Sequence, residues 1–181
     1  MQQINQIETN RFLLNMLEID DHVRVLEILR DKEVTRYLNV GKMETLDDAR
    51  NLVQDYLEGY KNGTKYPFAI TSKDDSGLIG VFVIKLDLFD EDCFEFTVFI
   101  DKKYWNKGVY SEVLPYMTAI AFDMIKTGNF RGFVMSSNRS SARVLLKNGF
   151  VLEKIFSVDG IADKIESYLM TRKQYEGVAE L

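Results

Sequence analysis

The sequence predicts one mixed α/β domain over residues 1–181, and three observations support this fold class. The chain has 181 residues, of which 46% are apolar, and this suits one domain with a sizeable core. Short apolar runs typical of strands alternate with segments whose apolar residues recur at helical spacing. No internal repeat, linker or low-complexity segment divides the chain. We therefore expect the element order β-α-α-β-β-β-α-β-α-β-β.

The first part of the chain predicts a strand, two main helices and a second strand. Residues 11–19 are typical of a strand, and Asp20 or Asp21 can cap the helix that follows. A short helical piece is expected at residues 31–38. Thr45 begins the next helix, which Gly63 ends in a left-handed conformation. Residues 65–71 favour a strand, and Pro67 places its beginning or an edge there.

The second part predicts two strands, a long helix and a final group of shorter elements. After a turn at residues 74–77, strands are expected at 78–88 and 93–100. Helical spacing then runs from Val109 to Lys126, with Pro115 in the early turns, where a missing N–H matters least. A strand, a helix and two strands complete the chain, at residues 130–136, 138–150, 150–158 and 164–172.

Composition excludes several classes of function. The chain carries 23 Lys and Arg against 28 Asp and Glu, and a net charge of −5 argues against nucleic acid as the main partner. Cys93 and His22 are the sole residues of their types, so we expect no disulfide, no metal site and no His-based triad. His22 is interpreted as a surface residue and Cys93 as an ordinary strand residue. We expect a soluble cytoplasmic protein without a membrane segment.

The stretch "YWNKGVYSEV", residues 104–113, joins a buried strand to a helix N-terminus. The first amides of a helix lack intrahelical partners and carry partial positive charge, and Gly108 lets the backbone approach a ligand closely. These features suit a phosphate group, beside which Lys102, Lys103 and Lys107 would add charge. The alternative is a plain strand-to-helix turn.

This stretch resembles the cofactor loop of the GNAT superfamily of acyl-CoA-dependent N-acetyltransferases, whose signature is Gln/Arg-x-x-Gly-x-Gly/Ala. The RimJ/RimL-type branch is the most similar, because its members read much like Tyr-Trp-Gly-Lys-Gly-Tyr-Ala-Thr-Glu-Ala. That branch also resembles "ETNRFLLNML", "LIG" and "NRSSARVLLKNGF" here, in consistent order over nearly the whole chain. The resemblance implies a mostly antiparallel sheet that is splayed at the cofactor site and flanked by helices.

The loop departs from the family signature at two positions. Trp105 replaces Gln/Arg, which is common in this branch, whereas Tyr110 replaces a small residue that keeps bulk away from the pyrophosphate. Tyr110 must turn aside, narrow the site, or make a new contact through its hydroxyl.

The resemblance also implies a set of residues that bind acetyl-CoA. Late backbone groups of the strand before the loop bind the pantetheine arm, loop amides bind the pyrophosphate, and an asparagine in the late helix touches the CoA arm. That asparagine, Asn138, is also positioned as an ordinary N-cap. Arg143, four residues before Lys147, either meets the phosphates or belongs to a solvated basic face. The full expected set is Val98, Phe99, Ile100, Asn106, Lys107, Gly108, Val109, Tyr110, Ser111, Asn138 and Arg143.

The implied reaction is attack of a neutral amine on the acetyl-CoA thioester, which requires a proton acceptor and a proton donor. Glu95 is the candidate base, because a carboxylate within an apolar strand is costly without a role or partner; the alternative is that it faces solvent beside Thr97. Many family members use a late-helix tyrosine as acid, and Leu145 stands there. Ser141 matches a serine of the branch and is the candidate acid, with Tyr116 and Tyr168 as possible substitutes.

Three functions remain open from the sequence. The first is an acetyl-CoA-dependent N-acetyltransferase for a protein N-terminal amine or a small-molecule amine, with the acceptor site expected near residues 30–60 and 157–167. The second is a catalytically impaired CoA-binding or regulatory protein of the same fold, suggested by Tyr110 and Leu145. The third is a domain that binds another phosphate ligand through the loop. The sequence leaves both a monomer and a homodimer open.

Overall fold

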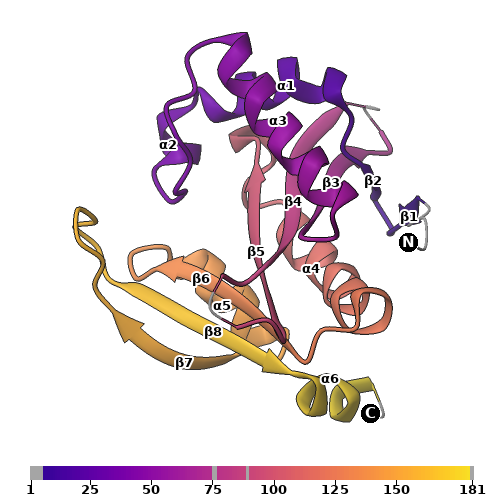
Figure 1. Cartoon of the computed structure of the whole chain (residues 1–181), viewed down its shortest axis with the longest axis vertical. Coiled ribbons are helices and arrows are strands. Elements are labelled where there is room, and N and C mark those ends of the chain that lie inside the picture. The colour runs from indigo at the N-terminus through magenta and orange to yellow at the C-terminus, as the bar shows by residue number, and fades with distance from the viewer. Residues whose placement is uncertain (1–5, 75–76, 89, 180–181) are drawn as a thin grey trace. The chain divides into compact units, whose positions relative to one another are not determined.

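A computed structural model describes residues 6–74, 77–88 and 90–179 of the chain (Figure 1). The described strands have the hydrogen-bonded order β1-β2-β3-β4-β5-β6-β8-β7, and all adjacent strands with a described register are antiparallel except β5 and β6. The chain divides into two compact units, one formed by Met1–Lys85 and Thr97–Val113 and the other by Leu86–Phe96 and Leu114–Leu181. The chain enters each unit twice, and one domain over residues 1–181 remains a prediction.

Unit 1 combines an antiparallel group of strands with the first helices. Its strands are β1 (Ile7–Glu8), β2 (Phe12–Met16), β3 (Lys65–Ser72), most of β4 (Leu78–Leu86) and the end of β5 (Cys93–Ile100). Its helices are α1 (His22–Leu29), α2 (Lys32–Thr35) and α3 (Leu46–Lys61), together with the start of α4 (Val109–Ala119). β3 pairs with β2 on one side and β4 on the other, so it is an interior strand whose Pro67 lies near its beginning.

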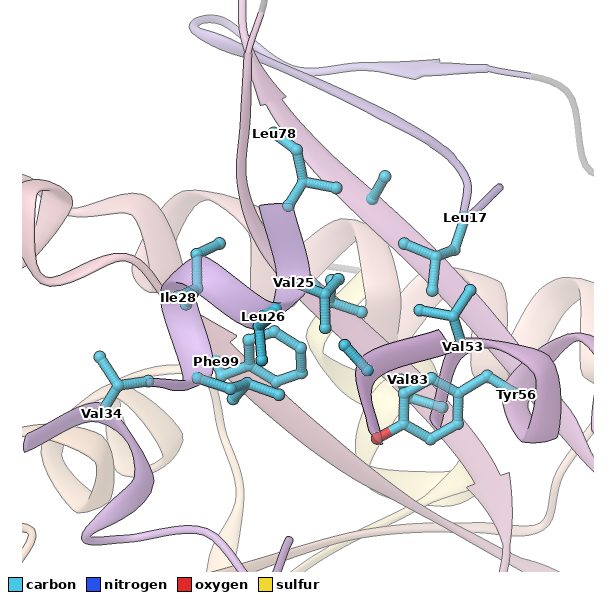
Figure 2. Close-up of a cluster of buried hydrophobic side chains, with 14 residues drawn as sticks. Leu17, Val25, Leu26, Ile28, Val34, Val53, Tyr56, Leu78, Val83 and Phe99 are labelled. Carbon is cyan, nitrogen blue, oxygen red and sulfur yellow. The ribbon is translucent and has the colours of Figure 1, made fainter. Parts of the chain in front are cut away.

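The core of unit 1 lies between these helices and strands (Figure 2). Val25 and Leu26 of α1 and Val53 and Tyr56 of α3 pack with strand residues such as Val83. Within each helix the buried residues recur at spacings of three or four positions, as in Val25 and Leu29 of α1 and Val53 and Tyr56 of α3, which the burial of one helix face requires. Phe99 of β5 belongs to the same cluster, which fixes the strand that precedes the glycine loop.

Local signals explain where α3 begins and ends. The Thr45 hydroxyl accepts a hydrogen bond from the Asp48 amide, and the Asp48 carboxylate accepts one from the Thr45 amide, which is a capping box. Gly63, just past the helix, has φ of 78°, as expected for a left-handed end. Both features confirm the boundaries that the sequence predicts.

Unit 2 is built on β6 (Asn129–Met135), β8 (Ile165–Thr171) and β7 (Val151–Phe156), with α5 (Arg139–Lys147). The beginning of β5, Cys93–Phe96, pairs in parallel with Asn129–Gly132 of β6. One face of these strands carries an aromatic core in which Phe96, Phe130 and Phe150 contact one another. A Cβ on Gly132 would lie 2.6 Å from the ring of Phe96, so any larger residue at this position of β6 would require that ring to shift.

The long helix after the loop changes its geometry part-way. Its α-helical part ends at Ala119, a π-helical segment covers Ile120–Ile125, and left-handed Lys126 ends it. Helix α6 (Arg172–Ala179) follows β8 directly (Figure 1) and holds this segment. Arg172 donates hydrogen bonds to the carbonyls of Phe122 and Thr127, and the Tyr175 ring stacks on Phe122.

The structure corrects the sequence-based expectations at several points. His22 is 8% exposed, and its Nδ1 lies 2.8 Å from the Ile19 carbonyl, so the prediction of a surface histidine is wrong. Pro115 lies inside α4 in its early turns, as the sequence predicts. The sequence predicts neither β1 nor α6, and the predicted turn at 74–77 lies partly outside the described residues. In the described ranges, no helix has both the length and the apolar character to cross a bilayer.

Candidate functional site

The end of β5 directs alternate backbone groups to opposite edges. The Asp101 amide donates to the Ile79 carbonyl, and the Phe99 carbonyl lies 2.6 Å from the position of a Cβ on Gly80, so both face β4. Because backbone groups alternate along a strand, those of Val98 and Ile100 are directed to the other edge. The Ile100 carbonyl accepts a hydrogen bond from Trp105 Nε1 at 2.9 Å. Of the three predicted pantetheine contacts, Val98 and Ile100 have the suitable orientation.

The glycine loop is shaped by two left-handed residues. A short 3₁₀ turn at Lys102–Tyr104 is capped by the Asp101 carboxylate, which accepts from the Lys103 amide. Asn106 then has φ of 58° and Gly108 has φ of 75°. Left-handed residues close to one another in a loop turn successive amides toward one side, which creates a concave surface suited to an anion.

Helix α4 begins immediately after this loop. The Glu112 amide donates to the Gly108 carbonyl at 3.0 Å, so Gly108 occupies the N-cap position. The amides of Val109, Tyr110 and Ser111 therefore form the first turn, where no helical carbonyl is in reach. Together with the positive end of the helix dipole, these amides favour a negatively charged group at the loop.

Arg11, which the sequence analysis did not select, lies against this loop. Its Nη1 donates to the Lys107 carbonyl at 2.8 Å, and its Nε donates to Glu112 Oε2 at 2.7 Å. The Arg11 amide and the Thr9 hydroxyl both donate to Glu112 Oε1, at 2.8 and 2.7 Å. Arg11 and Glu112 both lie within the motifs that carry the family resemblance, which is the one signal that could have indicated them.

The Glu112 carboxylate is ionised within this network. Its burial opposes ionisation, but the hydrogen bonds from Thr9 and Arg11 and the charge of Arg11 outweigh burial and lower its pKa. The side chain of Glu112 is 16% exposed and that of Arg11 is 49% exposed. The Arg11–Glu112 ion pair therefore joins a mostly buried carboxylate in α4 to a partly exposed guanidinium beside the loop.

The three lysines expected beside the loop differ in position. Lys107 is exposed in the loop, and its Nζ lies 5.1 Å from the centre of the Tyr104 ring. Lys102 is bound instead to Glu33 at 2.5 Å. Lys103 lines an open pocket of about 600 Å³ with residues of α1, including Arg24 and Glu27. Of the three, Lys107 is therefore the one within the loop itself.

Tyr110 lies in the first turn of α4, with a half-buried side chain. Helical spacing places it on the same side as Val113, Leu114 and Met117, which are all fully buried. Desolvation raises the pKa of its phenol above the ordinary value, so the hydroxyl stays protonated at neutral pH. This position favours the expectation that Tyr110 turns aside from the loop amides.

In unit 2, the start of α5 carries the other predicted cofactor residues. Asn138 Oδ1 accepts hydrogen bonds from the Ser141 amide at 3.2 Å and the Ser140 hydroxyl at 3.1 Å, so Asn138 is the N-cap. Ser141 is half-buried in the first turn, whereas Arg143 is exposed. The neighbouring Arg139 binds the buried carboxylate of Glu166 at 3.0 Å, which fixes this end of the helix to β8.

Glu95, the predicted base, lies on the opposite face of unit 2 from the aromatic core. Phe94 and Phe96 are buried, whereas Glu95, the residue between them, is half-buried. Successive side chains of a strand point to opposite faces, so Glu95 points away from the two phenylalanines. Its register partner on β6 is Arg131, so the two side chains share a face. Arg131 binds Asp87 at 2.5 Å and lies 3.4 Å from Glu153, so the guanidinium opposite Glu95 is already paired with two other carboxylates.

The other residues considered for proton transfer differ in their burial and contacts. Leu145, which occupies the position of the family's usual tyrosine in α5, is fully buried and lies close to Gly132 in the core. Tyr168 is buried and donates to Glu166 at 2.6 Å; burial and this hydrogen bond raise its pKa to about 12. Tyr116 is 38% exposed on α4. In the part of the chain that the structure describes, no three His, Cys, Asp or Glu side chains are grouped as metal ligands.

The predicted residues thus form two groups. Val98 to Ile100 and Asn106 to Ser111 belong to unit 1, whereas Glu95, Asn138, Ser141 and Arg143 belong to unit 2. A model of the "Acetyltransferase (GNAT) domain" family matches residues 11–151, which span the first group and reach past α5.

The chain belongs to the GNAT acetyltransferase family. A relative from Bacillus subtilis (strain 168), "Uncharacterized N-acetyltransferase YoaA", is 26% identical over 149 residues, which are 82% of this chain and 84% of that protein. The chain is therefore a GNAT N-acetyltransferase of the RimJ/RimL type.

Solved structures confirm the GNAT fold. A structure of RimL, described as a ribosomal L7/L12 alpha-N-protein acetyltransferase in complex with coenzyme A, has a TM-score of 0.79 at 15% identity; 92% of this chain and 97% of that chain are covered. Spermidine N-acetyltransferase from Vibrio cholerae, in complex with CoA and spermine, has a TM-score of 0.78 at 16% identity, with 91% and 98% covered. GNAT enzymes use acetyl-CoA as the acetyl donor.

Proposed function

We propose that this GNAT N-acetyltransferase binds acetyl-CoA at the glycine loop and transfers the acetyl group directly to a primary amine. The observation that carries the proposal is the loop geometry: left-handed Asn106 and Gly108 precede a helix whose first amides lack helical partners. Such a site binds the pyrophosphate of CoA through backbone donors. Lys107 adds positive charge, and Tyr110, on the buried side of α4, leaves the amides accessible.

The family resemblance implies further residues for acetyl-CoA, some of which belong to unit 1 and others to unit 2. In unit 1, the outward backbone groups of Val98 and Ile100 suit the amides of the pantetheine arm, and one of these N–H groups can donate to the thioester oxygen. Phe99 supports this segment through its place in the core. In unit 2, Asn138 uses Oδ1 as the helix cap, which leaves its Nδ2 group as the donor toward the CoA arm. Arg143 is exposed and can meet a phosphate.

Two side chains are assigned to proton transfer. Amines are mostly protonated at neutral pH, so the acceptor must lose a proton before it attacks. Glu95 takes this proton, directly or through one water molecule, before the neutral amine attacks. As the amine nitrogen forms its bond to the acetyl carbon and the carbon–sulfur bond breaks, Ser141 donates its proton to the sulfur and regains one from the amine nitrogen. Glu95, Asp87 and Glu153 outnumber Arg131 on this face, so its net negative charge attracts a cationic amine before the amine is deprotonated.

The acceptor is a primary amine of a protein N-terminus or of a small molecule. RimL acts on a ribosomal protein and the V. cholerae neighbour on spermidine, so both kinds of acceptor occur on this fold. The acceptor panel should therefore contain peptides with free N-termini, the same peptides with blocked N-termini, and polyamines. We expect release of CoA with at least one free amine and none with the blocked peptides.

Replacement of Glu95 tests the proposed base. We expect Glu95→Gln to lower kcat by a factor of about 10² to 10⁴, the range for loss of a general base, while the Kd for CoA stays nearly unchanged. Turnover should be partly restored at high pH, where more of the amine is neutral. An unchanged kcat would exclude Glu95 as the base.

Lack of turnover with every amine would favour the second candidate, a CoA-binding or regulatory protein of this fold. Leu145 at the position of the usual tyrosine is the observation that keeps this candidate open. Calorimetric titration with CoA then separates this candidate from the third function, because a CoA-binding protein of this fold still binds the cofactor. Tighter binding of simple nucleotides than of CoA would favour the third function instead.

A further inference from the structure

The cofactor loop is held by a group of residues from the beginning of the chain. Thr9 and Arg11 lie about one hundred positions before Glu112, yet four hydrogen bonds join these residues to Glu112 and to the loop carbonyl of Lys107. We call Arg11 and Glu112 the loop clamp.

Each polar group of the clamp has a defined partner. Glu112 Oε1 accepts from the Arg11 amide and the Thr9 hydroxyl, and Oε2 accepts from Arg11 Nε. A second guanidinium nitrogen, Nη1, reaches the Lys107 carbonyl. The planar guanidinium of Arg11 thus donates to the Glu112 carboxylate and to a backbone carbonyl at the same time. The single ammonium nitrogen of a lysine cannot reproduce this geometry.

The loop benefits from such support because Asn106 has a left-handed conformation that residues other than glycine adopt less readily. Asn106 and Gly108 both have positive φ, and Lys107 lies between them. Residues in this region persist where their surroundings fix them. The bond to the Lys107 carbonyl holds the peptide group between the two left-handed residues, and the bonds to Glu112 attach the same guanidinium to the first turn of α4.

We propose that Arg11 and Glu112 are positioning residues for acetyl-CoA: they hold the loop amides in the arrangement that binds the pyrophosphate. This inference rests on the proposed cofactor site and adds a group that acts on the loop rather than on the reacting atoms. It assigns a function to the charged residues of the first strand motif and of the helix that follows the loop.

Calorimetric titration with CoA tests the clamp with Arg11→Met, Arg11→Lys and Glu112→Gln. We expect each variant to raise the Kd for CoA by roughly tenfold, the effect of losing a hydrogen bond to a charged group. At saturating acetyl-CoA, kcat should stay near that of the wild type, because the clamp affects binding and not the chemical step. The control is Asp55→Asn, which breaks the Lys65–Asp55 pair of 2.5 Å elsewhere in unit 1 and should leave the Kd unchanged.

The lysine variant separates positioning from simple charge. If Arg11 acted by attracting phosphates, Arg11→Lys would keep full affinity while Arg11→Met lost it, and this result would overturn the proposal. Equal losses in both variants support it. An unchanged Kd in Glu112→Gln would also overturn it, since that variant removes the charge that holds the guanidinium.

Hydrogen exchange without ligand tests the same inference independently of CoA. The amide of residue 112, which donates to the Gly108 carbonyl, should exchange faster in Arg11→Met and Glu112→Gln than in the wild type, and at the wild-type rate in Asp55→Asn. If the wild type does not bind CoA, the proposed cofactor is wrong, whereas the exchange rates still decide whether the clamp orders the loop. Unchanged exchange in both clamp variants would exclude it.

Discussion

Gly108 is the residue whose left-handed backbone conformation matters most for the proposed cofactor site. Its φ of 75° disfavours any side chain, and a Cβ there would lie 3.4 Å from Arg11 Nη2. The sequence indicates this glycine through its place between a strand and a helix. The partner that faces it was not predictable from local pattern, because Arg11 lies 97 positions earlier and nothing in spacing joins the two.

Substitutions at Gly108 should separate strain from charge. Gly108→Ala should lower the free energy of unfolding by about 1 kcal/mol, since alanine must adopt a left-handed backbone, and weaken CoA binding modestly. Gly108→Glu should abolish CoA binding, because a carboxylate would occupy the anion site. Urea unfolding and calorimetry measure the two effects. Gly41→Ala is the control, since a Cβ there meets nothing within 4 Å; retained CoA binding in Gly108→Glu would show that the loop assignment is wrong.

Among single residues, His22 shows the limit of reasoning from sequence. It follows two aspartates at a helix start, which favours a surface position, yet it is buried and lies beside the Ile19 carbonyl. Its environment is set by a 3₁₀ turn, Ile19–Asp21, that the sequence did not indicate. Polar neighbours in the sequence therefore predict exposure only where the backbone stays in one type of secondary structure, and here it changes from a 3₁₀ turn to an α-helix at His22.

At the scale of elements, those with strong local signals were predicted well. The strands β3, β4 and β5 and the helices α3 and α5 have clear apolar periodicity and caps, and the structure confirms them. Helix α6 has few apolar residues and depends on Arg172 and Tyr175, whose partners lie some fifty positions earlier. The π-helical segment likewise depends on these tertiary contacts, so periodicity alone indicated a longer regular helix.

Helix α3 provides a direct test of a local signal. Thr45→Ala should lower the free energy of unfolding by about 1 kcal/mol, because it removes the hydroxyl that accepts from the Asp48 amide. Asn51→Ala, in the exposed middle of the same helix, should not destabilise the protein. The urea midpoints of the two variants measure the difference in unfolding free energy, provided that its dependence on urea concentration is the same in both. Equal midpoints would contradict the role of the cap.

At the scale of the whole molecule, the family and the fold were predictable because several motifs occur in a consistent order. The mixed sheet and the GNAT architecture follow from that order and are confirmed. The acceptor amine was not predictable, because the segments expected near it, residues 30–60 and 157–167, carry no motif specific to one substrate. Binding of acetyl-CoA by the intact chain is therefore the property to test first.

Thermal unfolding with and without acetyl-CoA tests binding by the whole protein. At a ligand concentration one hundred times Kd, the stabilisation is ~2.7 kcal/mol, which for a chain of this size raises the midpoint by roughly 5–11 °C. Gly108→Glu should show no increase. If the wild type also shows no increase, Tyr110 narrows the site more than its place on α4 suggests, and the protein has lost or exchanged its cofactor.

Cys93 has a practical consequence for such assays. It is the sole cysteine of the chain, it is fully buried, and burial raises the pKa of its thiol to about 12. A thiolate is needed for reaction with disulfide and maleimide reagents, so the folded protein should react with them very slowly. Colorimetric thiol reagents can therefore follow product CoA continuously against a low background, and a single cysteine introduced at the surface would accept a fluorescent label at one known position.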